Sequence, residues 1–302
     1  MDPIRNLCIV KNSFENKTIN KIPKYSEKTS QNYENLIGSP RARRKFLLEN
    51  KTDKEIIIDD IIIPNEIADP YINMDSFFKL RSSLVLADID SIFNFSRQED
   101  GYILPQVINM HYKYAILGKD KGFLQYMQYR LPASTGFIGC LDITKDEKIS
   151  LQFLNQNCSK DLEDYVLNIE PEGVNLVISN ELNENKLIQA LKLCDVNATF
   201  ITKIDNNTPI EYLYTIAMTF KTVSLIKPFL ENLNEKNSYF IAEGFQGNSL
   251  DVVSLEFLKI NVPNSFYSYV QNYYNSIKLL KNSLPKTIKY NLYKCKAILN
   301  LF

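Results

Sequence analysis

The spacing of apolar residues divides the chain into an arm, a central domain and a tail. Residues 1–50 are polar with few long apolar runs, which predicts a flexible basic arm. Across 51–256 apolar runs alternate with amphipathic stretches, as in a folded domain. Residues 257–302 mix Tyr, Lys and apolar residues, which predicts a helical extension.

Strand and helix signals alternate in the second half of the central domain. We predict strands at 148–155, 174–181, 198–205, 222–228 and 238–245, and helices at 160–169, 186–194 and 210–220. The strands are nearly continuous in Val, Ile, Leu and Phe, which is typical of a sheet covered on both faces. The pattern therefore predicts a Rossmann-like α/β fold, with its ligand site beyond the carboxyl ends of the strands.

The first half of the domain has a weaker pattern. Helical spacing over 77–93 predicts a helix, and the β-branched run 55–67 predicts a strand or a docking segment. The region 94–130 shows no element that we can assign.

The charges are segregated along the chain, although 35 Lys and Arg balance 35 Asp and Glu. Residues 1–50 hold ten basic and five acidic residues, and 257–302 hold seven Lys and no acid, which leaves 18 basic and 30 acidic residues between them. Basic segments favour contact with polyanions. We therefore expect RNA contacts through 39–46 and 257–302, or a basic protein partner subunit; a solvated linker is the alternative for 39–46.

Six tyrosines lie in the basic tail. They are Tyr267, Tyr269, Tyr273, Tyr274, Tyr290 and Tyr293. Aromatic faces stack on bases and lysines neutralise phosphates, so the tail is a candidate surface for single-stranded RNA. The alternative is a pair of amphipathic helices, split near Pro285, whose tyrosines belong to the core.

Several classes of site are disfavoured by composition. The five cysteines are scattered without a C-x-x-C pair, so we expect neither a disulfide framework nor a metal site. His111 is the single histidine and lies among apolar neighbours, which favours packing over catalysis. The chain has no apolar run of the roughly 18 residues that a membrane span needs, and its start lacks a signal-peptide core. We expect an intracellular, cytoplasmic protein without membrane contact.

The stretch 174–247 resembles the FtsJ-like RNA ribose 2′-O-methyltransferases, which include cap methyltransferases. VNLVISNE resembles the family strand D-L-V-L-S-D, and NATFITK, 197–203, resembles G-G-x-F-V-x-K. The pair Lys227-Pro228 and the closing YFIAEGF also match, and RSSLVLADID, 81–90, matches more loosely. The resemblance implies a methyltransferase fold that uses S-adenosylmethionine and acts on RNA.

The resemblance also implies four catalytic positions, which the family fills with Lys, Asp, Lys and Glu. Here they fall on Val85, Asn180, Lys203 and Asn237, so only Lys203 is kept. Asparagine can hydrogen-bond but carries no charge to stabilise a neighbouring ammonium. The substitutions predict a degenerate site. Carboxylates at Glu181, Glu231 or Glu235 are the alternative if the loops are built differently.

The segment ASTGF, 133–137, stands where the family has the donor loop A-P-G-G-F. Ala133, Gly136 and Phe137 match as cofactor-binding residues, whereas Ser134 and Thr135 replace Pro and Gly. A Cβ at Thr135 narrows the close backbone approach that glycine permits. We therefore expect no tight binding of S-adenosylmethionine.

Three hypotheses follow from the sequence. One is a degenerate methyltransferase fold that serves as an RNA-binding or subunit-interaction module in mRNA processing or capping. Another is an active, divergent cap or ribosomal RNA 2′-O-methyltransferase that uses Lys203 with substitute carboxylates. The last is an unrelated Rossmann-like scaffold for a different ligand, since a fold does not fix a function.

Overall fold

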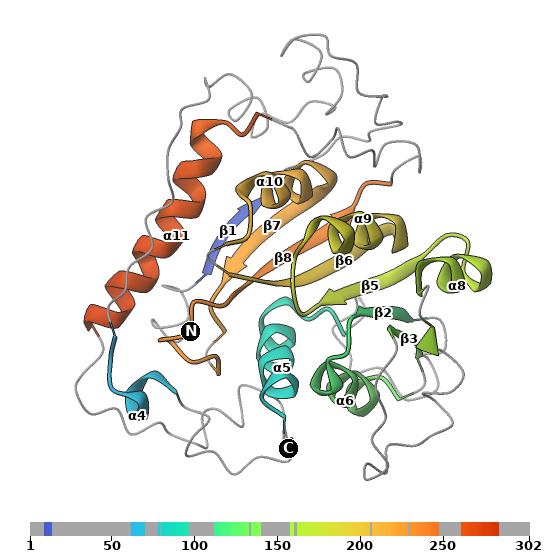
Figure 1. Ribbon diagram of the computed structural model, residues 1–302, viewed down its shortest axis with the longest axis horizontal. Coiled ribbons are helices and arrows are strands. Elements are labelled where there is room, and N and C mark those ends of the chain that lie inside the picture. The colour runs from blue at the N-terminus through green and yellow to red at the C-terminus, as the bar shows by residue number, and fades with distance from the viewer. Residues whose placement is uncertain are drawn as a thin grey trace.

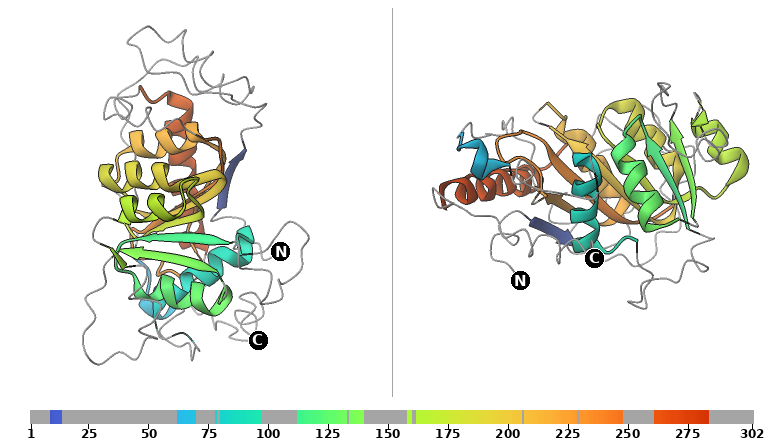
Figure 2. Two further views of the ribbon diagram at one scale, coloured as in Figure 1. Left: turned by 90° about the vertical axis from the view of Figure 1, so that its right-hand side faces the viewer. Right: turned by 90° about the horizontal axis from the view of Figure 1, so that it is seen from below.

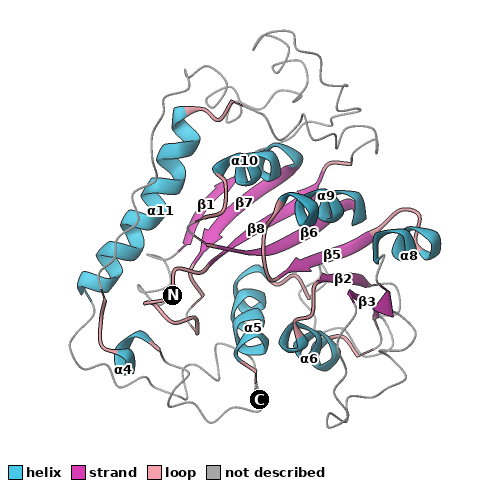
Figure 3. Cartoon of the chain, in the orientation of Figure 1, coloured by secondary structure: helices cyan, strands magenta, loops and turns pink. Residues whose placement is uncertain are grey.

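The core of the protein is one mixed sheet with helices on both faces (Figure 1). The computed structural model describes residues 9–13, 62–69, 78, 80–96, 112–132, 134–139, 158–159, 162–205, 207–228, 230–247 and 261–283. Within them the sheet has eight strands in the order β1-β7-β8-β6-β5-β2-β3-β4. Figure 3 shows how the strands form a continuous layer between the helices.

The elements have the following bounds. The strands are β1 (Ile9–Ser13), β2 (Lys113–Leu117), β3 (Thr135–Gly139), β4 (Cys158–Ser159), β5 (Val174–Ser179), β6 (Cys194–Ile204), β7 (Phe220–Ile226) and β8 (Ser238–Phe245). The helices are α4 (Asn65–Ala68), α5 (Arg81–Phe93), α6 (Lys121–Arg130), α8 (Leu162–Ile169), α9 (Glu184–Leu193), α10 (Ile210–Thr219) and α11 (Asn264–Ser283).

The strand directions locate the crevice of the fold. Strands β2 to β6 pair in parallel, whereas β8 lies antiparallel between β6 and β7. The chain runs outward from β2 through β3 to β4 and then returns to the other side of β2 with β5. In such sheets the ligand crevice lies beyond the carboxyl ends of the strands where the order reverses, here β2 and β5.

The two faces of the sheet bury different helices. Helices α8, α9, α10 and α11 share one apolar cluster with Ala115 and Leu117 of β2, and α5 and α6 share the other with Tyr114 and Ile116. Alternate residues of a strand point to opposite faces, which explains the division. Figure 2 shows the two helical layers from the side. The predicted Rossmann-like α/β fold is confirmed.

Most elements predicted between 160 and 245 are present within a few residues of their expected bounds. The expected strand at 148–155 lies outside the described residues. The region 94–130, left without an element, contains β2 and α6. A loop is expected at 133–137, but residues from Thr135 onward form β3.

The amino-terminal arm differs from the expectation in one place. The sequence predicts a flexible arm over 1–50, yet Ile9–Ser13 pair antiparallel with β7 from Ile226 to Thr222. The physical reason is that β7 would otherwise present an edge of unpaired backbone N–H and C=O groups. The basic segment 39–46 lies outside the described residues.

The tyrosines of α11 belong to the core. Tyr267, Tyr269, Tyr273 and Tyr274 are each at most 9% exposed and pack in the cluster that α11 shares with the sheet. Tyr273 Oη also donates to Ser238 Oγ at 2.7 Å. These four rings therefore have no face open to a nucleic-acid base. The prediction that they form a surface on which RNA bases stack is wrong. Tyr290 and Tyr293 lie outside the described residues.

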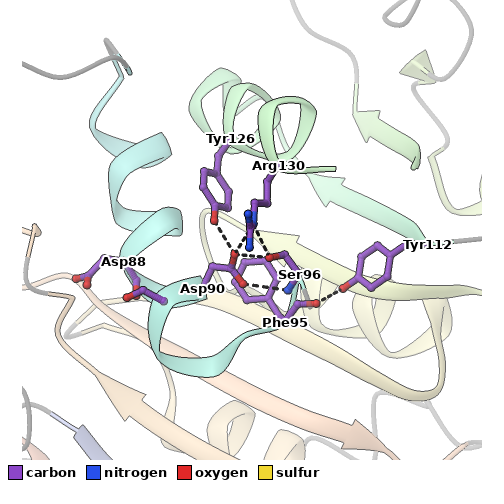
Figure 4. A network of polar contacts seen from close by, with 8 residues as sticks. Asp88, Asp90, Phe95, Ser96, Tyr112, Tyr126 and Arg130 are labelled. Carbon is purple, nitrogen blue, oxygen red and sulfur yellow. Dashed lines mark hydrogen bonds and ion pairs between the residues drawn. The ribbon is translucent and has the colours of Figure 1, made fainter. Parts of the chain in front are cut away.

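A buried carboxylate ties α5 to α6 (Figure 4). Asp90, at the end of α5, accepts hydrogen bonds from Ser96 N (2.9 Å), Ser96 Oγ (2.5 Å) and Tyr126 Oη (2.6 Å). Arg130 of α6 lies 3.6 Å from the carboxylate and donates to Ser96 Oγ. Tyr112 Oη donates to the neighbouring Phe95 carbonyl. The network fixes the turn after α5 against α6.

We expect Asp90→Ala to lower the free energy of unfolding by about 3 kcal/mol or more, because it removes one partner of a buried, hydrogen-bonded charge network. Urea unfolding of both proteins measures the difference. Glu172→Ala, which removes an exposed carboxylate, is the control and should change stability by less than about 0.5 kcal/mol. Equal effects of the two substitutions would contradict a structural role for the network.

Candidate functional site

Three of the four predicted catalytic positions lie at the carboxyl edge of the sheet. Ser179 pairs with Thr202, so Asn180 and Lys203 each follow a paired residue at the same level of β5 and β6. Lys203 in turn pairs with Tyr239 of β8, and Asn237 comes just before that strand. Asn180, Lys203 and Asn237 are all half-buried.

Val85 differs from these residues in chemical character and lies on a helix. It is in α5 and fully buried in the apolar cluster between α5, α6 and the sheet. A lysine there would have to bring its ammonium into an apolar environment, which is costly without a partner. The site therefore has no cation at this position.

The loop at the crevice, residues 118–120, is the element that the sequence analysis missed. Gly118 follows β2 directly and has a φ of +132°, a conformation that side chains with a Cβ rarely adopt. A Cβ on Gly118 would lie 2.9 Å from Asn180 Oδ1. The Asn180 amide thus lies against the loop backbone between the ends of β2 and β5. The available signal was the apolar run KYAIL followed by Gly118 and Gly122.

The start of α6 is occupied by the chain's own carboxylate. Asp120 Oδ1 accepts from the backbone N–H groups of Gly122 (2.9 Å) and Phe123 (3.1 Å), as an N-cap does. Ser82 of α5 donates to the same oxygen at 2.7 Å. Gly122 permits the close approach of α5, because a Cβ there would collide with Ser82 Oγ.

These contacts bear on the fit of S-adenosylmethionine. In this fold, amides at the start of the helix after the first crevice strand are where an anionic ligand group binds. Here the amides of Gly122 and Phe123 already donate to Asp120. The carboxylate of S-adenosylmethionine would therefore lie against the Asp120 carboxylate. Asn180 lies against the neighbouring glycine. The described side of the crevice therefore does not fit the methionine part of the donor.

The described residues that were predicted to bind the cofactor do not lie in the loop between β2 and α6. Gly136 and Phe137 are buried inside β3, where Phe137 makes an edge contact with Tyr165 at 6.3 Å between ring centroids. A Cβ on Gly136 would collide with the Tyr114 ring, so packing accounts for this glycine. Ala133 lies outside the described residues.

A buried lysine organises the loop between β7 and β8. Lys227 is only 3% exposed, and its Nζ donates to the carbonyls of Glu235 (2.7 Å) and Asn237 (2.5 Å). Burial lowers the pKa of Lys227 to about 8, against the opposing effect of the negative charge of Glu231. Lys281 of α11 and Lys203 are near enough to lower it further.

Glu231 is a buried carboxylate in the loop between β7 and β8, at the same edge of the sheet. It is 4% exposed, and burial raises its pKa, while the charges of Lys227, Lys203 and Arg81 act in the opposite direction. The charge of Lys203 thus influences one alternative carboxylate of the sequence analysis, although no hydrogen bond or ion pair joins the two among the described residues. Glu181 and Glu235 are exposed.

The part of the chain that the structure describes contains no cluster of metal ligands and no membrane-spanning helix. No group of three or more His, Cys, Asp or Glu residues there is placed to hold a metal ion. His111 lies outside that part. No helix among the described residues is long and apolar enough to cross a membrane.

Comparisons with known proteins found no matching family or curated protein, and they found solved structures of low similarity. No protein-family model matches the chain. No curated protein matches it. A putative hemolysin from Streptococcus thermophilus is similar with a TM-score of 0.41 and 10% identity, over 70% of this chain and 79% of that one.

Two RNA methyltransferases are also similar. An rRNA methylase from Streptococcus thermophilus has a TM-score of 0.35 and 11% identity, over 53% of this chain and 97% of that one. The 16S rRNA N2 G1207 methyltransferase of T. thermophilus, solved with AdoMet and guanosine, has a TM-score of 0.33 and 10% identity, over 46% of this chain and 36% of that one. With all three TM-scores below 0.5, these likenesses carry no argument about function, and the fold assignment rests on the strand order.

The buried ammonium of Lys227 predicts a pH dependence of stability. Its folded pKa of about 8 lies below the usual 10.5, so between these values the unfolded chain binds more protons than the folded one. Stability that depends on this lysine must therefore rise with pH in that window. We expect the stability of the wild type relative to Lys227→Met to rise by about 1 kcal/mol per pH unit between pH 8 and 10.

Urea unfolding across this range measures the effect. Lys221→Met is the matched control, because Lys221 is an exposed lysine at the opposite end of β7. Its difference from the wild type should not change with pH. A flat difference for Lys227→Met would mean that Lys227 keeps its proton throughout.

Proposed function

We propose that the chain is a degenerate methyltransferase-like domain that binds RNA at the carboxyl edge of its sheet and does not transfer methyl groups. A setting in mRNA processing or capping is what the resemblance to cap methyltransferases implies. The observation that carries the proposal is that the backbone amides at the start of α6, on the side of the crevice where the methyl donor would bind, already donate to Asp120.

The donor side supports the absence of methyl transfer. Asp120 takes the amides at the start of α6, and Asn180 lies against Gly118. Val85 and Asn237 supply no charge to the acceptor side. Proton-transfer assistance by a positioned side chain contributes roughly 10²–10⁴ in rate, so the loss of these groups removes most of the catalytic help that the family uses.

The cations of the edge support RNA as the ligand. Lys203, Lys227 and Arg81 act on Glu231, and Lys281 acts on Lys227. Lys281 belongs to the basic tail, so α11 contributes a lysine to the edge although its tyrosines are buried. Positive groups at an exposed edge bind phosphates and make the affinity depend on salt.

The alternative is an active enzyme, and one observation favours it. Glu231 lies within electrostatic reach of Lys203 and restores a carboxylate near the lysine that Asn237 does not provide. This alternative requires that S-adenosylmethionine binds, whereas the proposed function does not.

Calorimetric titration of the full chain with S-adenosylmethionine separates the two. We expect no heat of binding up to about millimolar donor, because a donor carboxylate would be repelled by Asp120 and find its amides occupied. Micromolar binding would contradict the degenerate site and support the enzyme. A parallel titration of Asp120→Asn, which removes the repelling charge but keeps an N-cap, tests whether that carboxylate is the obstacle.

For RNA we expect Lys281→Ala to weaken binding of a single-stranded oligouridylate several-fold. Loss of one phosphate contact should also reduce the slope of log affinity against log salt by about 0.7. Fluorescence anisotropy at a series of salt concentrations measures both. Lys221→Ala removes the same charge at the opposite edge of the sheet and should change neither. A wild type that does not bind RNA would leave a protein subunit as the partner.

A further inference from the structure

The segment 62–69, which we call the strap, is tied to the loop between β7 and β8 by polar contacts. The side chain of Asn234 accepts from Ile63 N (3.0 Å) and donates to Ile63 O (2.7 Å). It thus pairs with the strap backbone as a neighbouring strand would. Leu233 N donates to Ala68 O at 2.8 Å. The loop therefore holds the strap near both of its ends.

The last residue of the strap binds the first residue of α5. Asp69 is 4% exposed and forms an ion pair with Arg81 at 2.5 Å. Ser82, the next residue of α5, donates to Asp120 in the loop between β2 and α6. The strap therefore reaches from the loop between β7 and β8 to the point where α5 meets the crevice.

Polar contacts of this kind allow the strap to open while the sheet stays folded. Among the strap side chains that the structure describes, Ala68 is fully buried but small, and Ile62 is 83% exposed. The helix within the strap, α4, has one turn, and Pro64 at its N-cap gives it no side-chain hydrogen bond. Hydrogen bonds contribute little net free energy, because water replaces the protein partner on opening. Segments with few buried apolar contacts open locally, at a lower cost than global unfolding.

Opening of the strap removes the Asp69 carboxylate from Arg81. The side chain of Arg81 is 32% exposed, and its charge acts on Glu231, so the guanidinium lies at the carboxyl edge of the sheet. A guanidinium binds carboxylates and phosphates with the same donors. Asp69 and a phosphate group of a ligand therefore compete for Arg81.

We propose that the strap is an autoinhibitory latch, in which Asp69 holds Arg81 until a phosphate group of the bound RNA replaces it. The inference rests on the proposed function, because it names how binding at that edge is regulated. RNA then binds the open form. The apparent affinity equals the affinity of the open form multiplied by the fraction of chains in which the strap is open.

Hydrogen exchange followed by mass spectrometry measures the opening without a ligand. We expect peptides that cover the strap to exchange faster than those of β8, because they exchange through local opening. Asn234→Ala removes both hydrogen bonds to Ile63 and should speed exchange in the strap by about 10-fold. Asn185→Ala removes an exposed amide of α9 and is the control, which should leave this exchange unchanged.

Fluorescence anisotropy with the single-stranded oligouridylate measures the competition for Arg81. Asn234→Ala favours the open strap and keeps Arg81, so it should tighten binding by about the same 10-fold as it speeds exchange. Asp69→Asn removes the competing charge and should also tighten binding. Adding Arg81→Met to Asn234→Ala should cancel the gain, and Asn185→Ala should bind like the wild type. Thermal unfolding verifies that all variants are folded.

The outcomes separate this inference from the function on which it rests. If the strap exchanges only together with β8, the latch is overturned whatever the chain binds. Faster exchange in Asn234→Ala with an unchanged affinity for RNA overturns the competition and leaves RNA binding intact. If neither the wild type nor Asn234→Ala binds RNA, the proposed function fails and the competition for Arg81 fails with it.

Discussion

The buried ammonium of Lys227 is the contact on which the carboxyl edge depends. A charge taken out of water must be compensated, and here two backbone carbonyls and the charge of Glu231 do so. Both carbonyls belong to the loop between β7 and β8, so solvating the lysine also fixes the course of that loop. The same loop binds the segment 62–69, where Asn234 exchanges hydrogen bonds with the backbone of Ile63 and Leu233 N donates to Ala68 O. Asp69 then holds Arg81 at the start of α5. One desolvated lysine thus connects β7, the loop, the segment before α5 and α5 itself.

The crevice combines two opposite solutions for polar groups. At the start of α6 polar groups of the chain bond to one another, since Asp120 accepts hydrogen bonds from two backbone amides and from Ser82. Glu231 is buried and Lys203 is half-buried, and among the described residues neither side chain makes a hydrogen bond or an ion pair. Hydrogen bonds within the chain stabilise the fold and leave those groups unavailable to a ligand. A buried charge without a partner lowers the stability of the fold and can still bind one. The difference argues that the two sides of the crevice serve different purposes.

The elements from 160 to 245 could be predicted because their apolar runs are long and their ends are marked, as by Gly173 before β5. β2 is only five residues long and begins with a lysine, so its pattern did not stand out. Its loop still carried a signal in Asp120 and Gly122, an N-cap and a glycine two residues apart. Gly136 misled for a physical reason: a glycine required by the Tyr114 ring and one required by a ligand are identical in sequence. The burial of Glu231 could not be predicted, because it follows from a loop whose course Lys227 sets from within the fold.

Charge summed along the sequence is a poor guide to the field at this edge. The central segment is strongly acidic, yet Lys203, Lys227 and Arg81 lie close enough to act on one glutamate, and the tail adds Lys281. Acidic partners such as Asp69 and Glu235 lie among them, so the edge is a mixed surface and not a basic patch. Mixed surfaces bind less by bulk attraction than by matching individual donors and acceptors. At an edge of this kind the positions of the individual lysines and carboxylates therefore decide what can bind, and the net charge of the segment does not.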